Sequence, residues 1–443
     1  MLYLLLAITI LFTLINLKLS DKHFLQPSVL FCIVFGISIL ECIINAQKYQ
    51  ISFSVITLLI LIIGFATFTL CHFLLREKGA IVNNTHEIQP IHIPIIIAVL
   101  FIIVQLCAIF SFWVYLRNLA LANGSGLKLG EMISTYNLLS KFDQDTLRNL
   151  NVPIPFVFRI TNPISEVIGY FSLYVLINNW FSKRKDLIFP FVSTLLLVIL
   201  SMMSGSRTPL FRMVTFAVIL VCFYKIRKDG RLFFSAKTVG TVVIFIAILW
   251  LCVFTSMKFM GRDISQTPRS DYIFVYTGAP LLNLDSFVKS FSVKWIGKSG
   301  TGIFAGQTLT YLYGYISKIF RIPYPSIENL HVFTTSTNGL DTGNVYTMYL
   351  PLIYDFGIIG MIPAIFLMAF YYNFSYKKIM ENQSAYSFDY RLFIYAYLIN
   401  DLLMAPFANR FYNTVFSAGF IKFFVISGLG YLLFLAWKKK TEK

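Results

Sequence analysis

The chain has 443 residues, of which 57% are hydrophobic and only 13% are charged, and its mean hydropathy is +0.72. A soluble core of this length cannot bury so much apolar surface, so the composition excludes a soluble globular protein and indicates a polytopic membrane protein. The net charge of +17 indicates membrane orientation and affinity for anionic lipid headgroups. We expect no nucleic-acid partner from it.

Apolar runs long enough to cross about 30 Å of hydrocarbon predict an all-α polytopic integral membrane protein with about eleven transmembrane helices. In chain order these runs occupy residues 1–17, 28–45, 51–75, 94–116, 158–180, 187–204, 208–224, 238–257, 346–373, 391–408 and 413–437. The first run has neither a basic n-region nor a small-residue cleavage site, so we expect it to be retained as a span.

Lysine and arginine collect in four connections between these runs. The clusters lie at residues 183–185, 225–237, 377–378 and 438–440. Short translocated loops are poor in these residues, so all four clusters are expected in the cytoplasm. Eleven spans then place the N-terminus outside and the C-terminus in the cytoplasm. The predicted outer segments are 117–157, 205–207, 258–345 and 409–412.

The predicted organisation has four parts. They are a membrane domain at 1–257 with about eight spans, a large extracytoplasmic loop at 258–345, a membrane domain at 346–437 with about three spans, and a basic cytoplasmic tail at 438–443. Within the large loop, residues 282–296 and 308–320 predict amphipathic helices along the membrane surface. The six cysteines lie in or at the ends of apolar runs without CxxC spacing, which predicts no disulfide, no metal site and no cofactor.

Polar residues at the predicted outer boundary are the candidate site, because an ionisable side chain inside a span costs about 2.5–3.5 kcal/mol. Arg159, Asn162 and Glu166 fall on one face near the outer end of the fifth run, and Arg207 ends the turn before the seventh. The other members of this layer are Arg212, Arg262, Asp263, Tyr354, Asp355, Asn400, Asp401 and Arg410. Such a layer predicts a pocket for an anionic headgroup whose tail stays in lipid.

Each of these residues also has a structural interpretation. Arg207 or Arg410 can anchor the chain at lipid headgroups, and loop-edge tyrosines can form an aromatic belt. Glu166 or Asp355 can pair with a neighbouring arginine to hold the helices together. His331, alone of the five histidines, is expected outside the cytoplasm, where it can be incidental or catalytic.

Three short motifs resemble the Wzy-type oligosaccharide repeat-unit polymerases, which polymerise O-antigen and capsule. The motifs are SGSRT at 204–208, TGNVYT at 342–347 and YDFGIIG at 354–360. The similarity extends to the pattern of spans, with a large outer loop before the last three. A tandem motif of some members, Arg followed ten residues later by Gly in two outer loops, is not present. We therefore carry over only Arg207 and the segment 344–357.

The resemblance implies a membrane glycosyltransferase of the bacterial cytoplasmic (inner) membrane. It would join undecaprenyl-diphosphate-linked oligosaccharides on the outer face, producing O-antigen or capsular polysaccharide. The implied partners are these lipid-linked oligosaccharides, membrane lipids, a chain-length regulator and a flippase. No nucleotide sugars exist outside the cytoplasm, so the donor must release a lipid diphosphate, whose negative charge guanidinium groups can stabilise.

This chemistry assigns provisional roles to the polar layer. The predicted substrate and diphosphate ligands are Arg207, Arg262, Arg410, Arg159, Asn344 and Tyr346. The candidates for the general base, in order of preference, are His331, Asp355 and Glu166. Two alternatives remain open. A lipid-linked oligosaccharide flippase would need charges along a cavity in both halves of the bilayer, and an O-antigen ligase would share the diphosphate donor.

Overall fold

The computed structural model describes residues 1–76, 88–184, 186–229, 269–300, 302–323, 327–328, 330, 332–381 and 388–441. The predicted span 238–257 and the candidate residues Arg262 and His331 lie outside these described residues.

The described chain is mostly helical, as the sequence predicts. Its helices are α1 (Leu2–Leu19), α2 (Pro27–Ile44), α3 (Val55–Leu75), α4 (Ile95–Ala122), α5 (Leu129–Phe142), α6 (Gln144–Asn149), α7 (Phe156–Phe181), α8 (Ile188–Met203), α9 (Thr208–Asp229), α11 (Arg269–Thr277), α12 (Ala279–Ser290), α13 (Thr310–Phe320), α14 (Tyr349–Glu381), α15 (Tyr390–Leu403), α16 (Arg410–Val415) and α17 (Ala418–Thr441). A small antiparallel hairpin pairs β1 (Thr334–Thr335) with β2 (Asp341–Gly343).

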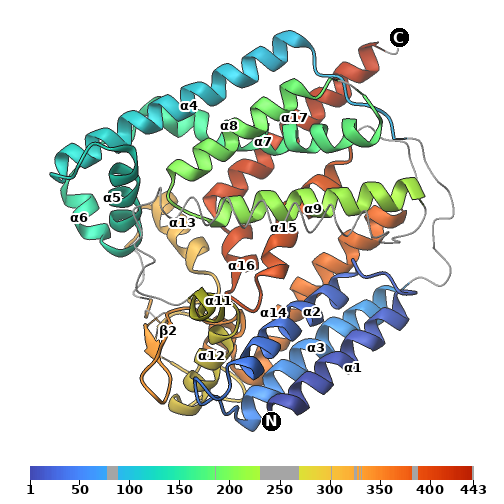
Figure 1. Ribbon diagram of the computed structural model, residues 1–443, viewed down its shortest axis with the longest axis vertical. Coiled ribbons are helices and arrows are strands. Elements are labelled where there is room, and N and C mark those ends of the chain that lie inside the picture. The colour runs from blue at the N-terminus through green and yellow to red at the C-terminus, as the bar shows by residue number, and fades with distance from the viewer. Residues whose placement is uncertain are drawn as a thin grey trace. The chain divides into compact units, whose positions relative to one another are not determined.

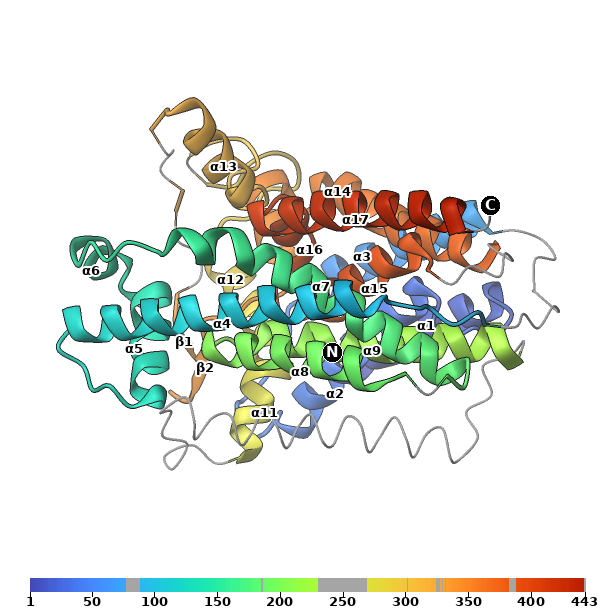
Figure 2. The same ribbon diagram turned by 90° about the horizontal axis from the view of Figure 1, so that it is seen from above.

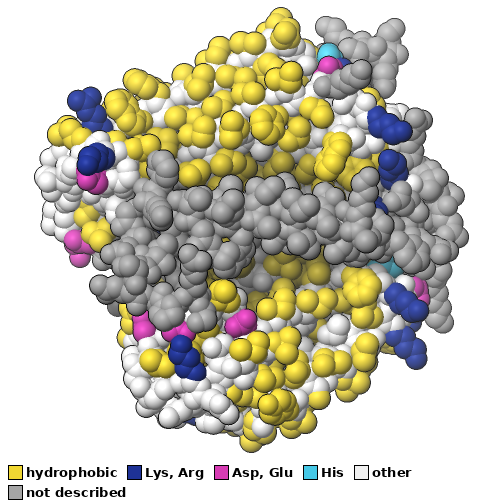
Figure 3. Space-filling view, viewed as in Figure 1, with side chains coloured by type: hydrophobic (Ala, Val, Ile, Leu, Met, Phe, Trp, Pro, Cys, Tyr) yellow, Lys and Arg dark blue, Asp and Glu magenta, His cyan; other side chains and the backbone are white. Residues whose placement is uncertain are grey.

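Eight of the described helices are long and apolar enough to cross a membrane: α1, α2, α3, α4, α7, α9, α14 and α17. The predicted spans 187–204 and 391–408 correspond to shorter helices, α8 with 16 residues and α15 with 14. Helix α15 ends before Pro406, which has no N–H to continue a helix. On the face shown in Figure 3, hydrophobic side chains cover the middles of the helices and charged side chains lie near their ends.

The chain forms two compact units. The first unit comprises Met1–Ile81, Thr267–Asn382 and Leu398–Ile421, and the second comprises Val82–Gln266, Gln383–Tyr397 and Lys422–Lys443. The described part of the predicted large outer loop, from residue 269, therefore belongs to the first unit, where α11 and α12 contact α2 and α12 also contacts α3.

In the first unit, α1, α2, α3 and α14 lie side by side (Figure 1). Polar side chains join them near one end. Gln26 Nε2, just before α2, donates to Asn373 Oδ1 of α14 at 2.8 Å. Ser28 Oγ of α2 donates to the same oxygen at 3.1 Å. Asn16 Nδ2 of α1 donates to Thr69 Oγ1 of α3 at 2.7 Å. Hydrogen bonds between membrane helices contribute about 0.6 kcal/mol each, so these contacts mainly fix the order and register of the helices.

Helix α12 differs from the surface helix predicted at 282–296, because most of its residues are buried in the first unit. Its Asp285 Oδ1 accepts hydrogen bonds from Ser54 N at 2.7 Å and from Thr57 Oγ1 at 2.8 Å. The polar side of α12 thus faces the N-terminus of α3 rather than water. This contact ties the segment after residue 268 to the short connection between α2 and α3.

Helix α13 agrees with the amphipathic helix predicted at 308–320. None of its residues is buried, and Figure 2 shows it standing clear of the other elements of its unit. Tyr311, Ile319 and Phe320 are all exposed. An exposed apolar helix of this kind suits a membrane surface.

In the second unit, α4, α7, α8 and α9 pack together, and α5 and α6 occupy the segment 117–157, where the sequence had predicted no helix. Phe112 and Tyr115 of α4 share a buried cluster with Ile133 of α5 and Met203 of α8. Helix α4 runs to Ala122, beyond its predicted end at 116, because this cluster continues its apolar contacts past that point.

A buried ion pair joins α9 to the start of α15 in the second unit. Arg227 Nη2 of α9 lies 2.6 Å from Asp389 Oδ2. The other carboxylate oxygen, Oδ1, accepts from Leu392 N at 3.1 Å and so caps α15. Because Asp389 is almost fully buried, loss of this ion pair would be destabilising.

Candidate functional site

The predicted site residues fall in both units. Arg159, Glu166 and Arg207 belong to the second unit, and Asn344, Tyr346, Asp355 and Arg410 belong to the first. Each group is therefore a separate candidate site.

In the second unit, the structure brings Glu166 of α7 together with Arg212 of α9 through a tyrosine. Tyr397 Oη of α15 donates to Glu166 Oε1 at 3.0 Å, and Arg212 Nη1 donates to Tyr397 Oη at 3.0 Å. The guanidinium carbon also lies 4.6 Å from the centre of the Tyr397 ring, a cation–π distance. A carboxylate and a guanidinium are thus held on one phenol inside an apolar unit.

The tyrosine that joins these charges is firmly packed. Tyr397 is 3% exposed. Its ring stacks on Phe423 at 4.1 Å and meets the edge of Tyr170 at 5.0 Å. Two aromatic contacts fix the ring, so the hydroxyl has little freedom to leave either partner. Sequence reasoning noted Glu166 and Arg212 but missed Tyr397, because a tyrosine in an apolar helix ordinarily indicates packing.

Arg207 lies in the turn between α8 and α9, and this turn rests on α5. Gly205 has φ +64°, and a Cβ there would come within 2.9 Å of Asn137 Cβ. Glycine is needed both for the left-handed backbone and for the close approach to α5. The half-buried Arg207 directly precedes α9, whereas Arg159, near the start of α7, is exposed and makes no ion pair with the described residues.

In the first unit, the predicted motif at 354–360 contains a break in a long helix. Gly357 has φ 81° and ψ 176° and divides the 33-residue α14 into two parts. An extended segment supplies the hydrogen bonds that the break leaves open. Gly297 N and Ser299 N donate to Phe356 O and Tyr354 O, both at 2.9 Å. In return, Ile358 N and Ile359 N donate to carbonyls of the same segment, at Lys294 (3.1 Å) and Trp295 (2.8 Å).

Asp355 holds the continuation of this segment. It is 2% exposed, and its Oδ2 and Oδ1 accept from Thr308 N at 2.7 Å and Gln307 N at 3.3 Å. Both carboxylate oxygens of Asp355 thus accept hydrogen bonds from backbone N–H groups. This arrangement favours a role in holding residues 307–308 in place over a role in proton transfer. The neighbouring Tyr354 donates through its hydroxyl to Glu328, which adds a third tether between α14 and this region.

Asn344 and Tyr346 follow the hairpin of the first unit. Asn283 Nδ2 donates to Thr342 O at 3.1 Å and Val345 O at 2.9 Å, which fixes the backbone on both sides of Asn344. Tyr346 Oη donates to Val332 O at 3.2 Å. Burial raises the pKa of Tyr346, so this phenol stays protonated at neutral pH. The Asn344 side chain is half-buried and makes no hydrogen bond to the described residues.

Arg410 begins α16 and is half-buried. Its guanidinium carbon lies 5.7 Å from the ring centre of Phe407. In the described part of the chain, no three His, Cys, Asp or Glu side chains come together as a metal site requires.

The described helices and this placement of charged groups define the class: a multi-pass helical membrane protein with ionisable side chains and a broken helix inside its apolar units. The chain matches no family model, no curated protein and no solved structure.

Proposed function

We propose that this protein is a membrane glycosyltransferase that polymerises polyprenyl-diphosphate-linked oligosaccharide repeat units on the outer face of the bacterial cytoplasmic membrane. Its product would be O-antigen or capsular polysaccharide. In the proposed topology eleven spans place the N-terminus outside and the C-terminus in the cytoplasm, with residues 258–345 on the outer face.

The cluster of Glu166, Tyr397 and Arg212 is the observation that carries this proposal. Charges inside apolar helices are costly and mark functional sites in membrane proteins. This cluster combines the two groups that the reaction needs, a carboxylate to accept a proton and a guanidinium to stabilise an anionic leaving group. Arg212 follows Arg207 by little more than one turn of helix, so both guanidinium groups belong to the same end of α9.

In the proposed reaction, the terminal hydroxyl of the acceptor attacks the anomeric carbon of the donor sugar. A bond forms between that carbon and the acceptor oxygen, and the bond to the lipid diphosphate breaks. The diphosphate leaves with the bonding electron pair, stabilised by Arg207 and Arg212, with Arg262 as a further candidate ligand. A general base takes the hydroxyl proton.

Glu166 becomes a stronger candidate for this base than Asp355. The Asp355 oxygens are both occupied by backbone N–H groups, whereas Glu166 Oε1 accepts from Tyr397 and its second oxygen has no hydrogen bond to a described residue. His331, outside the described residues, remains a candidate.

A lipid-linked oligosaccharide transporter is the second candidate function, favoured by a polar cavity in the first unit. The cavity has a volume of about 110 Å³ and lies where α1, α3 and α14 end and α2 begins, on the proposed cytoplasmic side. It is lined by Asp21, His23, His72, Arg76 and Lys377, among others. A space of this size admits a few waters rather than an oligosaccharide, so we retain the polymerase as the main proposal.

The test is the surface glycan ladder of a deletion strain complemented with variants. Wild type should restore long chains, whereas Arg207→Ala and Glu166→Gln should leave surface glycan of a single repeat unit. Arg148→Ala is the matched control, because this arginine lies in the same proposed outer region on α6 and is 75% exposed. Complete loss of surface glycan in the deletion strain would favour a transporter or ligase. Normal ladders from both site variants would contradict the assigned residues.

A further inference from the structure

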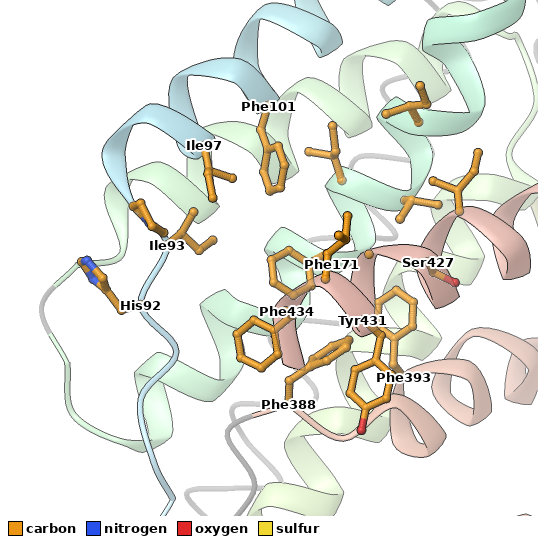
Figure 4. A pocket seen from close by; sticks show the side chains of 17 residues that line it. His92, Ile93, Ile97, Phe101, Phe171, Phe388, Phe393, Ser427, Tyr431 and Phe434 are labelled. Carbon is orange, nitrogen blue, oxygen red and sulfur yellow. The ribbon is translucent and has the colours of Figure 1, made fainter. Parts of the chain in front are cut away.

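The second unit contains an apolar cavity that the proposed chemistry does not use. Its volume is about 430 Å³, within the range of about 300–1,000 Å³ found for ligand pockets. Figure 4 shows Phe101 of α4, Phe171 of α7 and Phe434 of α17 around the hollow. The polar side chains among its lining residues are His92, Ser427 and Tyr431. Such walls suit a hydrocarbon chain and give a charged group no partner inside.

The segment that carries His92 is held in place at the edge of this cavity. Asn179 of α7 forms two hydrogen bonds with the backbone of Ile91, accepting from its N–H at 2.8 Å and donating to its carbonyl at 3.0 Å. Asn178 Nδ2 donates to Gln89 O at 2.9 Å. Both asparagines are buried, and together they fix an extended segment just before α4. Figure 4 shows His92 at the margin, away from the aromatic side chains.

Basic side chains gather at the same margin. Arg184 Nη2 lies 2.9 Å from His92 Nδ1 and also pairs with Asp186 at 2.6 Å, and Lys183 precedes it in the chain. The N-terminus of the 28-residue α4 begins three residues after His92 and adds a partial positive charge. An apolar cavity with a basic margin is complementary to a lipid that has an anionic headgroup.

We infer that this cavity binds one acyl chain of an anionic phospholipid, with its phosphate at Arg184 and the start of α4. The occupant is a phospholipid of the inner leaflet because the basic margin lies on the proposed cytoplasmic side. The proposed polyprenyl diphosphate would instead place its phosphates near Arg207, at the opposite end of α8. The lipid site needs no catalytic residue, and only its assignment to the inner leaflet rests on the proposed topology.

Gly430 gives a direct test. It lines the cavity, and a Cβ built there meets no atom within 4 Å. Gly430→Leu should therefore add a side chain at the wall of the cavity without a clash and exclude the lipid. Gly419→Leu is the control on the same helix, because Gly419 is exposed and does not line the cavity. A second filling variant, Ile97→Trp, acts from α4.

The measurement is native mass spectrometry of each purified variant in detergent with added phosphatidylglycerol. Wild type and Gly419→Leu should retain one phospholipid, and Gly430→Leu should lose it at least tenfold. Arg184→Ala should weaken retention of phosphatidylglycerol more than that of phosphatidylcholine. Equal retention by Gly430→Leu and Ile97→Trp as by wild type would overturn the inference. So would retention of detergent only, or of a polyprenyl phosphate in place of the phospholipid.

Discussion

Replacing Gly357 by alanine would place a Cβ in the break of α14. The residue has φ 81°, a backbone conformation that side chains other than glycine rarely adopt. The new Cβ would lie 2.8 Å from Lys294 O and 2.9 Å from Trp295 O, closer than Cβ contacts normally are. The variant must therefore either strain the break or push the segment 294–299 away from α14.

Both outcomes lower the stability of the protein. Retaining the glycine conformation with a side chain costs about 1–3 kcal/mol. Releasing the segment instead removes four backbone hydrogen bonds that contribute about 0.5–1.5 kcal/mol each. The variant takes the less costly outcome, so we expect a loss of about 1–3 kcal/mol, which lowers the Tm by about 1–3 °C in a chain of this length.

Thermal unfolding of the purified variant in detergent measures this loss. Gly36→Ala is the matched control, because Gly36 lies within α2 and its Cβ would meet only Thr9 Cγ2, at an ordinary 3.5 Å. That control should be neutral or stabilising by up to about 1 kcal/mol. Trypsin should also cut Gly357→Ala faster at Lys294 and Lys298. If Gly357→Ala and Gly36→Ala have the same Tm and cleavage rate, the segment does not depend on the break.

Three further changes test other parts of the structure. Tyr397→Phe keeps the ring but removes the hydroxyl that bonds both the carboxylate and the guanidinium, so the glycan ladder should shorten. Loss of these hydrogen bonds should also cost about 1–3 kcal/mol of stability. A normal ladder would refute the role of this hydroxyl. Burial lowers the pKa of His23 below its usual 6.5 despite the opposing charge of Asp21. The stability that neutral His23 contributes is complete above pH 6.5 and is lost as the pH falls towards the lowered pKa. The Tm should therefore decline as the pH falls below about 6.5, and His23→Gln should flatten that decline. Arg227→Met removes the ion pair of the buried Asp389 and should destabilise the protein by about 3–5 kcal/mol, measured as Tm against wild type.

The positions of the long helices could be predicted from hydropathy because eight described runs satisfy the length that hydrocarbon requires. Helix α12 could not be placed in the same way. An amphipathic pattern shows that one side of a helix is polar but not what that side meets. At α12 it meets Ser54 and Thr57 through Asp285, and this partner lies more than 200 residues earlier in the chain.

The candidate site was predictable to a similar extent. The sequence identifies Glu166 and Arg212 as candidate site residues because charges in apolar runs are costly. Tyr397 carried no such signal, and it lies 231 residues from Glu166 in the chain. Only the packing of α7 and α9 with the part of α15 that belongs to the second unit shows that its hydroxyl joins the two charges. A sequence can thus identify charged groups that need partners, whereas neutral partners follow from the fold.

Asp355 and Gly357 illustrate how two unfavourable features become compatible. A carboxylate in an apolar helix and a break in that helix each leave polar groups that hydrocarbon cannot satisfy. One segment satisfies both, because residues 294–299 bond to the break and residues 307–308 bond to Asp355. Asp355→Asn weakens the second contact, and Gly357→Ala disrupts the first. If the segment moves as a whole, releasing it once removes both sets of bonds. The double variant should then lose less stability than the sum of the single losses, by at least about 0.5 kcal/mol in a double-mutant cycle. Additive losses would show that the two contacts hold independent pieces of chain.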